Sequence, residues 1–166
     1  MTPGFRAQVG RPTRYMRGLE AKLRVGDQLS KYGHVEQGLG TDGEPDLRLN
    51  TDRARYSLEV KSMLPYHLRA KGTSPDPGRI NLDREAWESM ATLARRGGRV
   101  PVLVVEVRIK TRPNLFHWIT EGQVDQWMAR SPGVQMIHVS LYDLPVISKY
   151  SWRPGVMDEI RMRDEL

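Results

Sequence analysis

Hydrophobic residues recur along this chain with the period of a helix in some segments and the period of a strand in others. The clearest helical segment is 82–96, where Leu82, Ala86, Met90 and Leu93 fall on one face of a helix. Asn81 or Asp83 can cap its start, acidic residues stand in its first turn, two arginines in its last turn and a Gly-Gly pair directly behind it. These are the usual signals for the two ends of a helix, so the pattern predicts a helix here.

Another helix is predicted over residues 14–31, with a less regular apolar pattern. One apolar stripe runs from Met16 to Leu23, and a second stripe on a different side contains Val25 and Leu29.

Short segments rich in β-branched and aromatic residues, bounded by Gly, Pro, Asn and Asp, predict strands. The predicted strands are 34–37, 46–49, 55–63, 100–107, 115–119 and 134–141, with a short helix at 123–129. Residues 65–78 hold several prolines and glycines and are predicted to form a loop without periodic structure. Strands followed by a helix and a buried strand predict an α/β fold, in which helices flank a central mixed β-sheet.

The chain has the size and composition of one globular domain, with 166 residues of which 39% are hydrophobic and 28% charged. Residues 1–13 are predicted to be a basic flexible arm, 14–142 the folded domain and 143–166 a C-terminal extension of unknown role. No apolar segment reaches the length of a membrane span, and no secretory signal is recognisable. The chain has no cysteine, which suits a reducing compartment, so a cytoplasmic location without membrane contact is expected.

Positive charge is concentrated at the N-terminus. The net charge is +6, and residues 1–31 carry seven basic and two acidic side chains. Such a segment either neutralises the phosphates of a nucleic acid or is a solvated terminus, and charge alone does not separate the two interpretations.

The candidate chemistry lies on two neighbouring strands. Pro45-Asp46 begins one of them, and the next carries Glu59-Val60-Lys61. Because side chains alternate along a strand, Glu59 and Lys61 would stand on one face about 7 Å apart, while Val60 points into the core. Two carboxylates can hold a hard cation such as Mg²⁺, and a lysine can stabilise the negative charge that develops on a phosphoryl group. This combination is typical of metal-dependent phosphodiester cleavage.

Further elements occur in a fixed order around this motif. They are Arg17-Gly18-Leu19-Glu20, Gly33, Asp46, Glu59-Val60-Lys61 and Gly97-Gly98-Arg99-Val100-Pro101-Val102-Leu103. Over residues 14–120 this succession resembles the PD-(D/E)xK nuclease superfamily and, within it, the archaeal-type Holliday junction resolvases. The resemblance implies a restriction-endonuclease-like core, so that residues 14–142 would be the nuclease domain.

The resemblance also assigns roles to individual residues. Asp46 and Glu59 would be metal ligands together with the backbone carbonyl of Val60, and Lys61 would be the catalytic lysine. Glu20 would approach the metal from the first helix, which makes Asp46, Glu59, Lys61 and Glu20 the candidate catalytic set. The expected cofactor is Mg²⁺, with Mn²⁺ as a possible substitute.

Two other acidic residues, Glu36 and Glu44, are rivals of Glu20 for the additional acidic position. An exposed helix glutamate paired with Arg17 or Arg24 is the alternative interpretation of Glu20.

Basic residues outside this set are candidates for contact with DNA phosphates. They are Arg6, Arg11, Arg14 and Arg17 of the N-terminal segment and Arg69 and Lys71 of the loop. In two respects the chain departs from the family pattern. The loop after Lys61 is longer than expected, and a basic residue expected late in the buried strand is missing, so that Arg108 or Lys110 would have to replace it.

The expected function is therefore a Mg²⁺-dependent endonuclease that resolves four-way DNA junctions. Two symmetric cuts require two active sites, so a homodimer is expected to bind the branched DNA. Two alternatives remain open: a sequence-specific nuclease of the restriction or homing type, and a catalytically silent DNA-binding module on the same fold.

Overall fold

The computed structural model describes residues 13–39, 41–67, 76–109, 113–144 and 151–152. Its helical elements are α2 (Arg14–Leu29), α3 (Arg84–Arg96), α4 (Glu121–Arg130) and the short 3₁₀ helix η1 (Leu141–Asp143). Its strands are β1 (His34–Gln37), β2 (Leu47–Asn50), β3 (Arg55–Met63), β4 (Tyr66–His67), β5 (Asp76–Pro77), β6 (Arg79–Asp83), β7 (Val100–Val107), β8 (Leu115–Thr120), β9 (Met136–Ser140) and β10 (Ser151–Trp152). The elements predicted from sequence are all present in the predicted order.

The largest sheet has six strands in the order β1-β2-β3-β7-β8-β10. Strands β3 and β7 run parallel, and the other neighbouring pairs run antiparallel. A parallel pair requires a crossover connection, which here contains α3. The central mixed sheet expected from the sequence is therefore confirmed.

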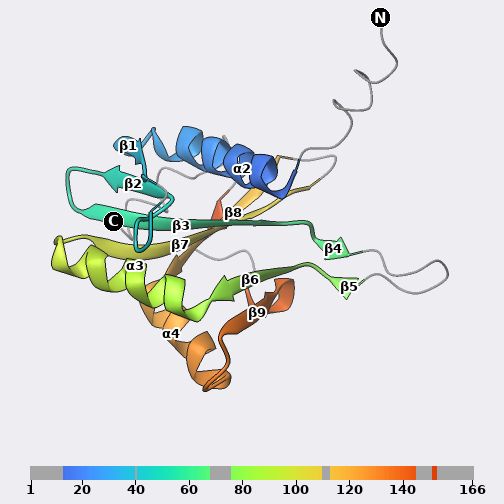
Figure 1. Ribbon diagram of the computed structural model, residues 1–166. Coiled ribbons are helices and arrows are strands. Elements are labelled where there is room, and N and C mark those ends of the chain that lie inside the picture. Colours follow the sequence, from blue (N-terminus) through green and yellow to red (C-terminus); the bar gives the residue numbers. More distant parts are fainter. Residues whose placement is uncertain (1–12, 40, 68–75, 110–112, 145–150, 153–166) are drawn as a thin grey trace, which may run out of the picture.

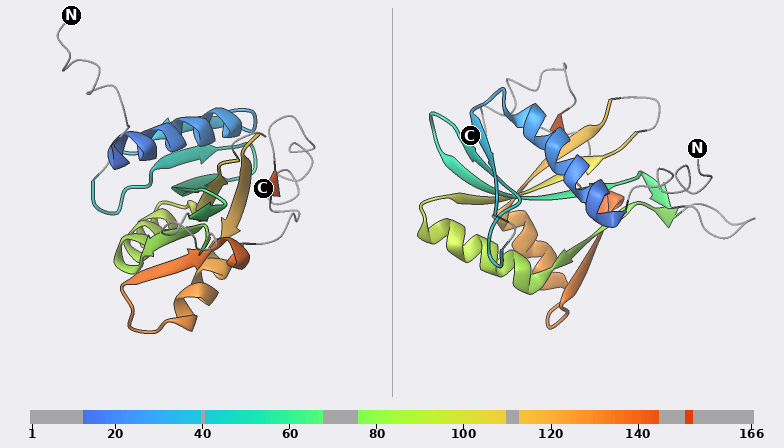
Figure 2. Two further views of the ribbon diagram at one scale, coloured as in Figure 1. Left: turned by 90° about the vertical axis from the view of Figure 1, so that its right-hand side faces the viewer. Right: turned by 45° about the horizontal axis from the view of Figure 1, so that its top comes forward.

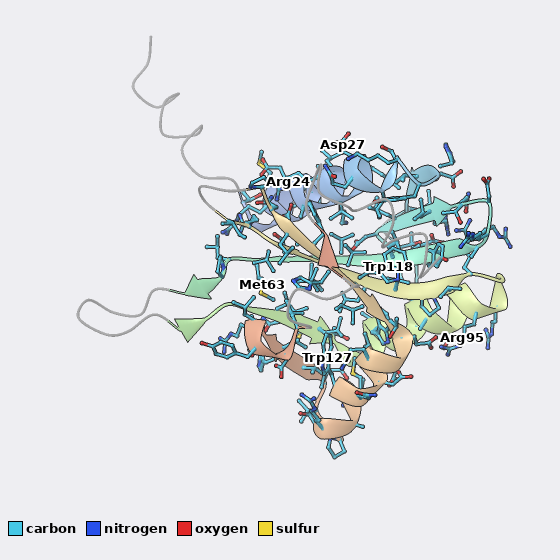
Figure 3. All side chains as sticks on the ribbon, turned by 180° about the vertical axis from the view of Figure 1, so that it is seen from behind. Arg24, Asp27, Met63, Arg95, Trp118 and Trp127 are labelled. Atoms are coloured by element: carbon cyan, nitrogen blue, oxygen red, sulfur yellow. The ribbon has the colours of Figure 1, made fainter. Side chains whose placement is uncertain are left out.

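Helices cover both faces of this sheet (Figure 1). Helix α2 packs on one face, where Leu58 of β3 and Trp118 of β8 belong to its core. Helices α3 and α4 lie on the opposite face, where Trp87 and Trp127 are buried. Two further views show the same three layers (Figure 2), and Figure 3 places Trp118 and Trp127 at different levels of the molecule. Each face of the sheet thus has its own hydrophobic core.

Helix α2 buries the second of its two apolar stripes. Ala21, Val25 and Leu29 are at most 2% exposed, whereas Met16 and Leu23 are 50% and 54% exposed. The side chain of Thr13 caps the helix by accepting a hydrogen bond from the Met16 N–H. The stripe that begins at Met16 is therefore a surface stripe in this chain.

At the start of α3 the prediction was wrong for Leu82 and was confirmed for Asp83, which was one of the two predicted caps. Leu82 lies on β6, which pairs antiparallel with β9, and the helix starts only after Asp83, whose side chain caps it. The partners of this pair are far apart in the sequence, as the 57-residue separation of Asn81 and His138 illustrates. The residue pattern within a short segment of the sequence does not predict the pairing of two strands so far apart.

The region predicted as an unstructured loop contains a two-stranded ribbon formed by β4 and β5. The part of the loop between these strands, with Arg69 and Lys71, lies outside the described residues.

Two parts of the segment predicted as a C-terminal extension join the domain. Leu144 is buried in the core under α3 and α4, and β10 pairs with β8 at the edge of the sheet. Among the described residues, the helices are too short or too polar to cross a membrane.

Among the described residues, one stretch of β3 has a paired strand on one side only. Strand β2 pairs with β3 only from Asn50↔Arg55 to Leu47↔Leu58, while β3 continues to Met63 alongside β7. Asp46 lies at the last point of contact, where its N–H donates to the Leu58 carbonyl at 2.9 Å. The open edge of β3 beyond this point is where the candidate residues gather.

Candidate active site

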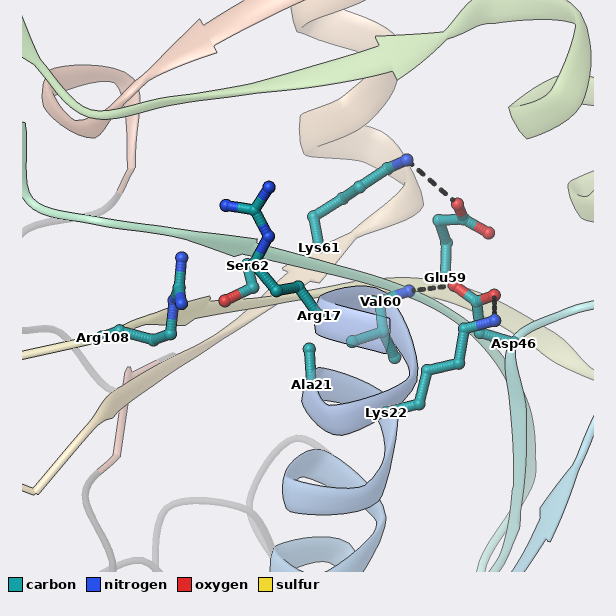
Figure 4. Close-up of a pocket in the computed structure, with 10 residues that line it drawn as sticks. Arg17, Ala21, Lys22, Asp46, Glu59, Val60, Lys61, Ser62 and Arg108 are labelled. Carbon is teal, nitrogen blue, oxygen red and sulfur yellow. Dashed lines mark hydrogen bonds and ion pairs between the residues drawn. The ribbon is translucent and has the colours of Figure 1, made fainter. Parts of the chain in front are cut away.

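A cavity of about 450 Å³ opens beside the unpaired stretch of β3, between α2 and the end of β7 (Figure 4). Its polar and charged lining residues are Arg17, Lys22, Asp46, Glu59, Lys61, Ser62 and Arg108. The residues come from four separate parts of the chain, and they include Asp46, Glu59 and Lys61 of the predicted catalytic set. The fold thus brings these three residues together.

The alternation of β3 separates the core residues from the functional residues. Leu58 and Val60 are buried against α2 at 0% and 7% exposure. The side chains of Glu59 and Lys61 remain 24% and 31% exposed, and Lys61 Nζ lies 3.4 Å from Glu59 Oε1. This confirms that the strand directs its apolar side chains into the core and leaves its charged pair at the cavity.

The carboxylate of Asp46 is oriented by backbone contacts. Its Oδ2 atom accepts a hydrogen bond of 2.8 Å from the Val60 N–H, a donor that β2 would otherwise have paired. The residue before it, Pro45, is buried and restricts the backbone at this turn. Asp46 therefore presents a fixed carboxylate next to Glu59, as a metal-binding or catalytic carboxylate requires.

Lys22 of α2 reaches the second oxygen of the same carboxylate. Its Nζ atom lies 2.8 Å from Asp46 Oδ1, with side-chain exposures of 35% and 18% for the two residues. Figure 4 shows Lys22 and Lys61 approaching the two carboxylates from different elements. Each carboxylate in the cavity consequently has its own lysine.

The electrostatics of Glu59 are unusual. Burial raises the pKa of its carboxyl group to about 7, and the nearby Asp46 carboxylate acts in the same direction, while Lys61 and Lys22 partly oppose the shift. The neighbouring carboxylates of Asp46 and Glu59 repel each other in this partly buried site. A bound cation would be favoured here, because it stabilises the charged form of both groups.

The far end of the cavity is cationic. Figure 4 shows the guanidinium groups of Arg17 and Arg108 at the Ser62 side of the cavity. The Nε atom of Arg108 is buried and has no hydrogen-bond partner within the described part of the chain. A buried donor without a partner is costly, and an anion such as a phosphate would satisfy it.

The buried strand behind the cavity carries an acidic residue where a basic one was expected. Glu106 is 0% exposed and accepts hydrogen bonds from Ser62 Oγ at 2.8 Å and Asn114 Nδ2 at 3.1 Å, in addition to Arg24. Glu106 therefore lies behind the cavity wall and holds the side chain of Ser62, which lines the cavity. Of the two candidates for the missing basic residue, Arg108 lines the cavity, and Lys110 lies outside the described residues.

Glu20 does not line the cavity. It is exposed on α2, where two residues correspond to a rotation of about 200°, so Glu20 and Lys22 lie on opposite sides of the helix. Glu20 is close enough to Arg24 to raise the pKa of its guanidinium, although Glu106 is the larger cause. Its role at a metal stays a prediction.

The two rivals of Glu20 have other partners. Glu44 Oε2 lies 2.6 Å from Arg48 Nη2, and Glu36 Oε1 lies 3.3 Å from His34 Nε2. Neither Glu36 nor Glu44 lines the cavity.

Most of the predicted DNA-binding residues cannot be placed. Arg6, Arg11, Arg69 and Lys71 lie outside the described residues, and for Arg14 only the backbone, at the start of α2, is described. Arg17 lines the cavity and is the member of this set that lies next to the candidate catalytic residues.

The donor set fits a hard divalent cation with few protein ligands. Asp46, Glu59 and the Val60 carbonyl would supply oxygen atoms, and Mg²⁺ typically uses one or two carboxylates, several waters and substrate phosphates. Within the described ranges no group of three or more His, Cys, Asp or Glu side chains is placed to hold a metal ion. A metal here would accordingly depend on solvent and substrate oxygens for most of its coordination.

Sequence reasoning did not single out Lys22 or Ser62 as site residues. Lys22 follows the buried Ala21 directly and thus flanks the buried face of α2, a signal that becomes readable once Ala21, Val25 and Leu29 are identified as that face. Ser62 lies two residues beyond Val60 on the same side of β3, and no residue-type signal marks it.

Comparison with known proteins identifies the fold. No family model matches the chain, and no curated protein matches its sequence. Among solved structures, the chain is similar to Hjc from Archaeoglobus fulgidus, a Holliday junction resolvase of an archaeal hyperthermophile. The TM-score is 0.56 at 14% sequence identity, over 88% of this chain and 96% of that chain. This likeness extends over nearly the whole of both chains and confirms the predicted α/β fold, in which helices flank a central mixed sheet.

Proposed function

We propose that this protein is a Mg²⁺-dependent DNA endonuclease that resolves four-way junctions by paired symmetric cuts. The observation that carries the proposal is the meeting of Asp46, Glu59 and Lys61 at the open edge of β3. The likeness to a junction resolvase supports the choice of DNA as substrate. Together they favour phosphodiester hydrolysis over a purely structural role.

The residues divide into two groups by their place in the cavity. Asp46, Glu59 and the Val60 carbonyl would hold the cation, which supplies Lewis-acid polarisation of the phosphoryl group and lowers the pKa of water. Lys61 Nζ, now 3.4 Å from Glu59, would neutralise negative charge as it develops on the phosphoryl oxygens. A water oxygen would attack phosphorus and release a proton to solvent. The bond from phosphorus to the 3′ oxygen would break, and that oxygen would take a proton from solvent and leave as a hydroxyl.

Arg17 and Arg108 would position the strand that is cut. Their guanidinium groups can bind backbone phosphates without reading base sequence, which suits a substrate recognised by its shape. Both arginines lie on the Ser62 side of the cavity, and Ser62 is about 7 Å along β3 from Val60. Phosphates next to the scissile one therefore have cationic partners within reach.

Junction selectivity requires a second active site. Two cuts at matching positions need two protomers related by a twofold axis, so we propose a homodimer as the active form. Linear duplex offers the same phosphates, and only a twofold surface matched to the junction can prefer the branched substrate.

The proposal is tested by incubating the full chain with labelled four-way junction, linear duplex or single strand, with Mg²⁺ or with EDTA. We expect paired cuts in the junction with Mg²⁺ and none with EDTA, and light scattering should give the mass of a dimer. Equal cleavage of duplex and junction by a monomer would contradict the resolvase assignment but retain the nuclease. Sequence-dependent cuts in duplex would favour the restriction-type alternative, and binding without any cleavage would favour the silent module.

A further inference from the structure

Lys22 differs from the other cationic residues of the cavity because it contacts Asp46, a candidate metal ligand. It does not belong to the group of Asp46, Glu59 and Lys61, which we call the strand motif. Its Nζ atom lies 2.8 Å from Asp46 Oδ1, while Asp46 Oδ2 is already used by the Val60 N–H. Both carboxylate oxygens of Asp46 are therefore engaged. Oδ1, the oxygen that a cation could reach without disturbing β3, is held by the lysine.

The charge of the cavity adds to this competition. Its lining contains the cationic side chains of Arg17, Lys22, Lys61 and Arg108 but only the two carboxylates of Asp46 and Glu59. A divalent cation entering the free protein would meet an excess of positive charge at close range, which disfavours binding. The backbone phosphates of DNA would reverse this balance, because each carries a negative charge.

The position of Lys22 allows it to change partners. Its neighbours Ala21 and Val25 are buried, so the helix backbone is fixed against the sheet. The lysine side chain itself is 35% exposed and carries its charge on a flexible stem. The ammonium group can leave Asp46 without any movement of α2.

We propose that Lys22 couples metal binding to DNA binding, by occupying Asp46 in the free protein and transferring to a backbone phosphate when DNA enters the cavity. This inference rests on the proposed function, since it assumes that Asp46 is a metal ligand. The coupling is reciprocal: if DNA strengthens metal binding, the metal strengthens DNA binding by the same factor. The cation is thus bound more tightly in the complex with DNA than in the free protein.

The test is a titration of the full chain with Mn²⁺, in which electron paramagnetic resonance counts the unbound cation. The variants are Lys22→Met and, as the charge-matched control outside the cavity, Lys31→Met; both remove one lysine, and Lys31 is exposed. Thermal melts verify that the variants fold, and Lys22→Gln provides a second, polar replacement. The same titrations are repeated with a phosphorothioate four-way junction, so that cleavage does not consume the complex.

For the free protein, we expect Lys22→Met to bind Mn²⁺ about tenfold more tightly than wild type, the effect of removing one competing ion pair. Lys31→Met should match wild type. Junction DNA should increase the Mn²⁺ affinity of the wild-type protein about tenfold. It should increase the Mn²⁺ affinity of Lys22→Met by a clearly smaller factor.

Equal Mn²⁺ affinity of wild type and Lys22→Met, with binding abolished by Asp46→Asn, would overturn the coupling and leave the metal site standing. Failure of every variant to bind Mn²⁺, with or without DNA, would overturn the coupling and the proposed metal-dependent function together.

Discussion

The guanidinium group of Arg24 on α2 holds the carboxylate of Glu106 on β7 through two hydrogen bonds. Nε donates to Oε2 at 2.6 Å, and Nη2 donates to Oε1 at 2.8 Å. Glu106 is fully buried, whereas Arg24 is 37% exposed. This pair joins the helix that carries Arg17 and Lys22 to the strand that leads to Arg108, and these three residues line the cavity.

Breaking the pair from the arginine side should destabilise the protein. Arg24→Met leaves a buried carboxylate without its cation, and we expect a loss of about 2 kcal/mol in the free energy of unfolding, because Ser62 and Asn114 still donate to Glu106. Urea unfolding measures this loss. Arg24→Met combined with Glu106→Leu should recover part of it, and strictly additive effects would contradict a direct interaction.

The three residues of the strand motif should be required for cleavage and dispensable for binding. Asp46→Asn, Glu59→Gln and Lys61→Ala are each expected to lower the single-turnover cleavage rate about a hundredfold or more, since they act on the cation and the transition state. DNA affinity measured in EDTA should stay within about threefold of wild type, because without the cation it depends mainly on phosphate contacts. Glu88→Gln, at an exposed position of α3 outside the cavity, is the matched control, and wild-type turnover in any of the three would remove that residue from the site.

Glu20 should have a much smaller effect than the strand motif. It lies on the opposite side of α2 from Lys22 and does not line the cavity, so we expect Glu20→Gln to keep the cleavage rate within about threefold, as for other exposed charges. The measurement is the same single-turnover assay at saturating Mg²⁺. A loss as large as that of Asp46→Asn would instead place Glu20 at the metal, as the resemblance implies.

Arg17 and Arg108 should contribute to affinity for every DNA shape. Arg17→Gln or Arg108→Gln is expected to weaken binding and to reduce the slope of log K against log salt by about one per lost phosphate contact. Titrations at four or more salt concentrations determine the slope. Arg130→Gln on α4, on the opposite face of the sheet, is the charge-matched control, and a slope equal to wild type would exclude the mutated arginine from the DNA contact.

The strand motif was predictable because its information is local. Glu59 and Lys61 lie on β3, and Asp46 directly precedes β2, the strand that comes before β3 in the sequence and pairs with it. The alternation of Leu58 and Val60 decides which side of β3 faces the core. Once those strands pair, the convergence of the three side chains follows.

The contribution of α2 was not predictable in the same way. Two apolar stripes compete on this helix, and only packing on the sheet decides that Val25 faces the core while Met16 stays exposed. That choice turns Lys22 toward the cavity and Glu20 away from it. The burial of Glu106 was equally hidden, because its partner Arg24 lies 82 residues earlier in the chain.

The stability of the fold should depend on His117 in mildly acidic solution. This residue of β8 is 3% exposed, and its Nδ1 atom has no hydrogen-bond partner among the described residues. Burial lowers the pKa of the imidazole from 6.5 to about 4. Between these two pH values the unfolded chain binds a proton that the folded protein does not, so stability rises with pH across this window and levels off above 6.5.

The expected size of this effect follows from the shift in pKa. At about 1.4 kcal/mol per pH unit, protonation of His117 in the unfolded chain should remove roughly 3 kcal/mol between pH 6.5 and pH 4. Urea unfolding of wild type and His117→Leu over this range isolates the contribution, since the carboxylates titrate in both proteins and cancel in the difference. His138→Gln, which changes an exposed histidine, should retain the wild-type pH dependence. An identical pH dependence for wild type and His117→Leu would mean that the buried imidazole keeps an ordinary pKa, and a polar partner would then have to reach its Nδ1 atom.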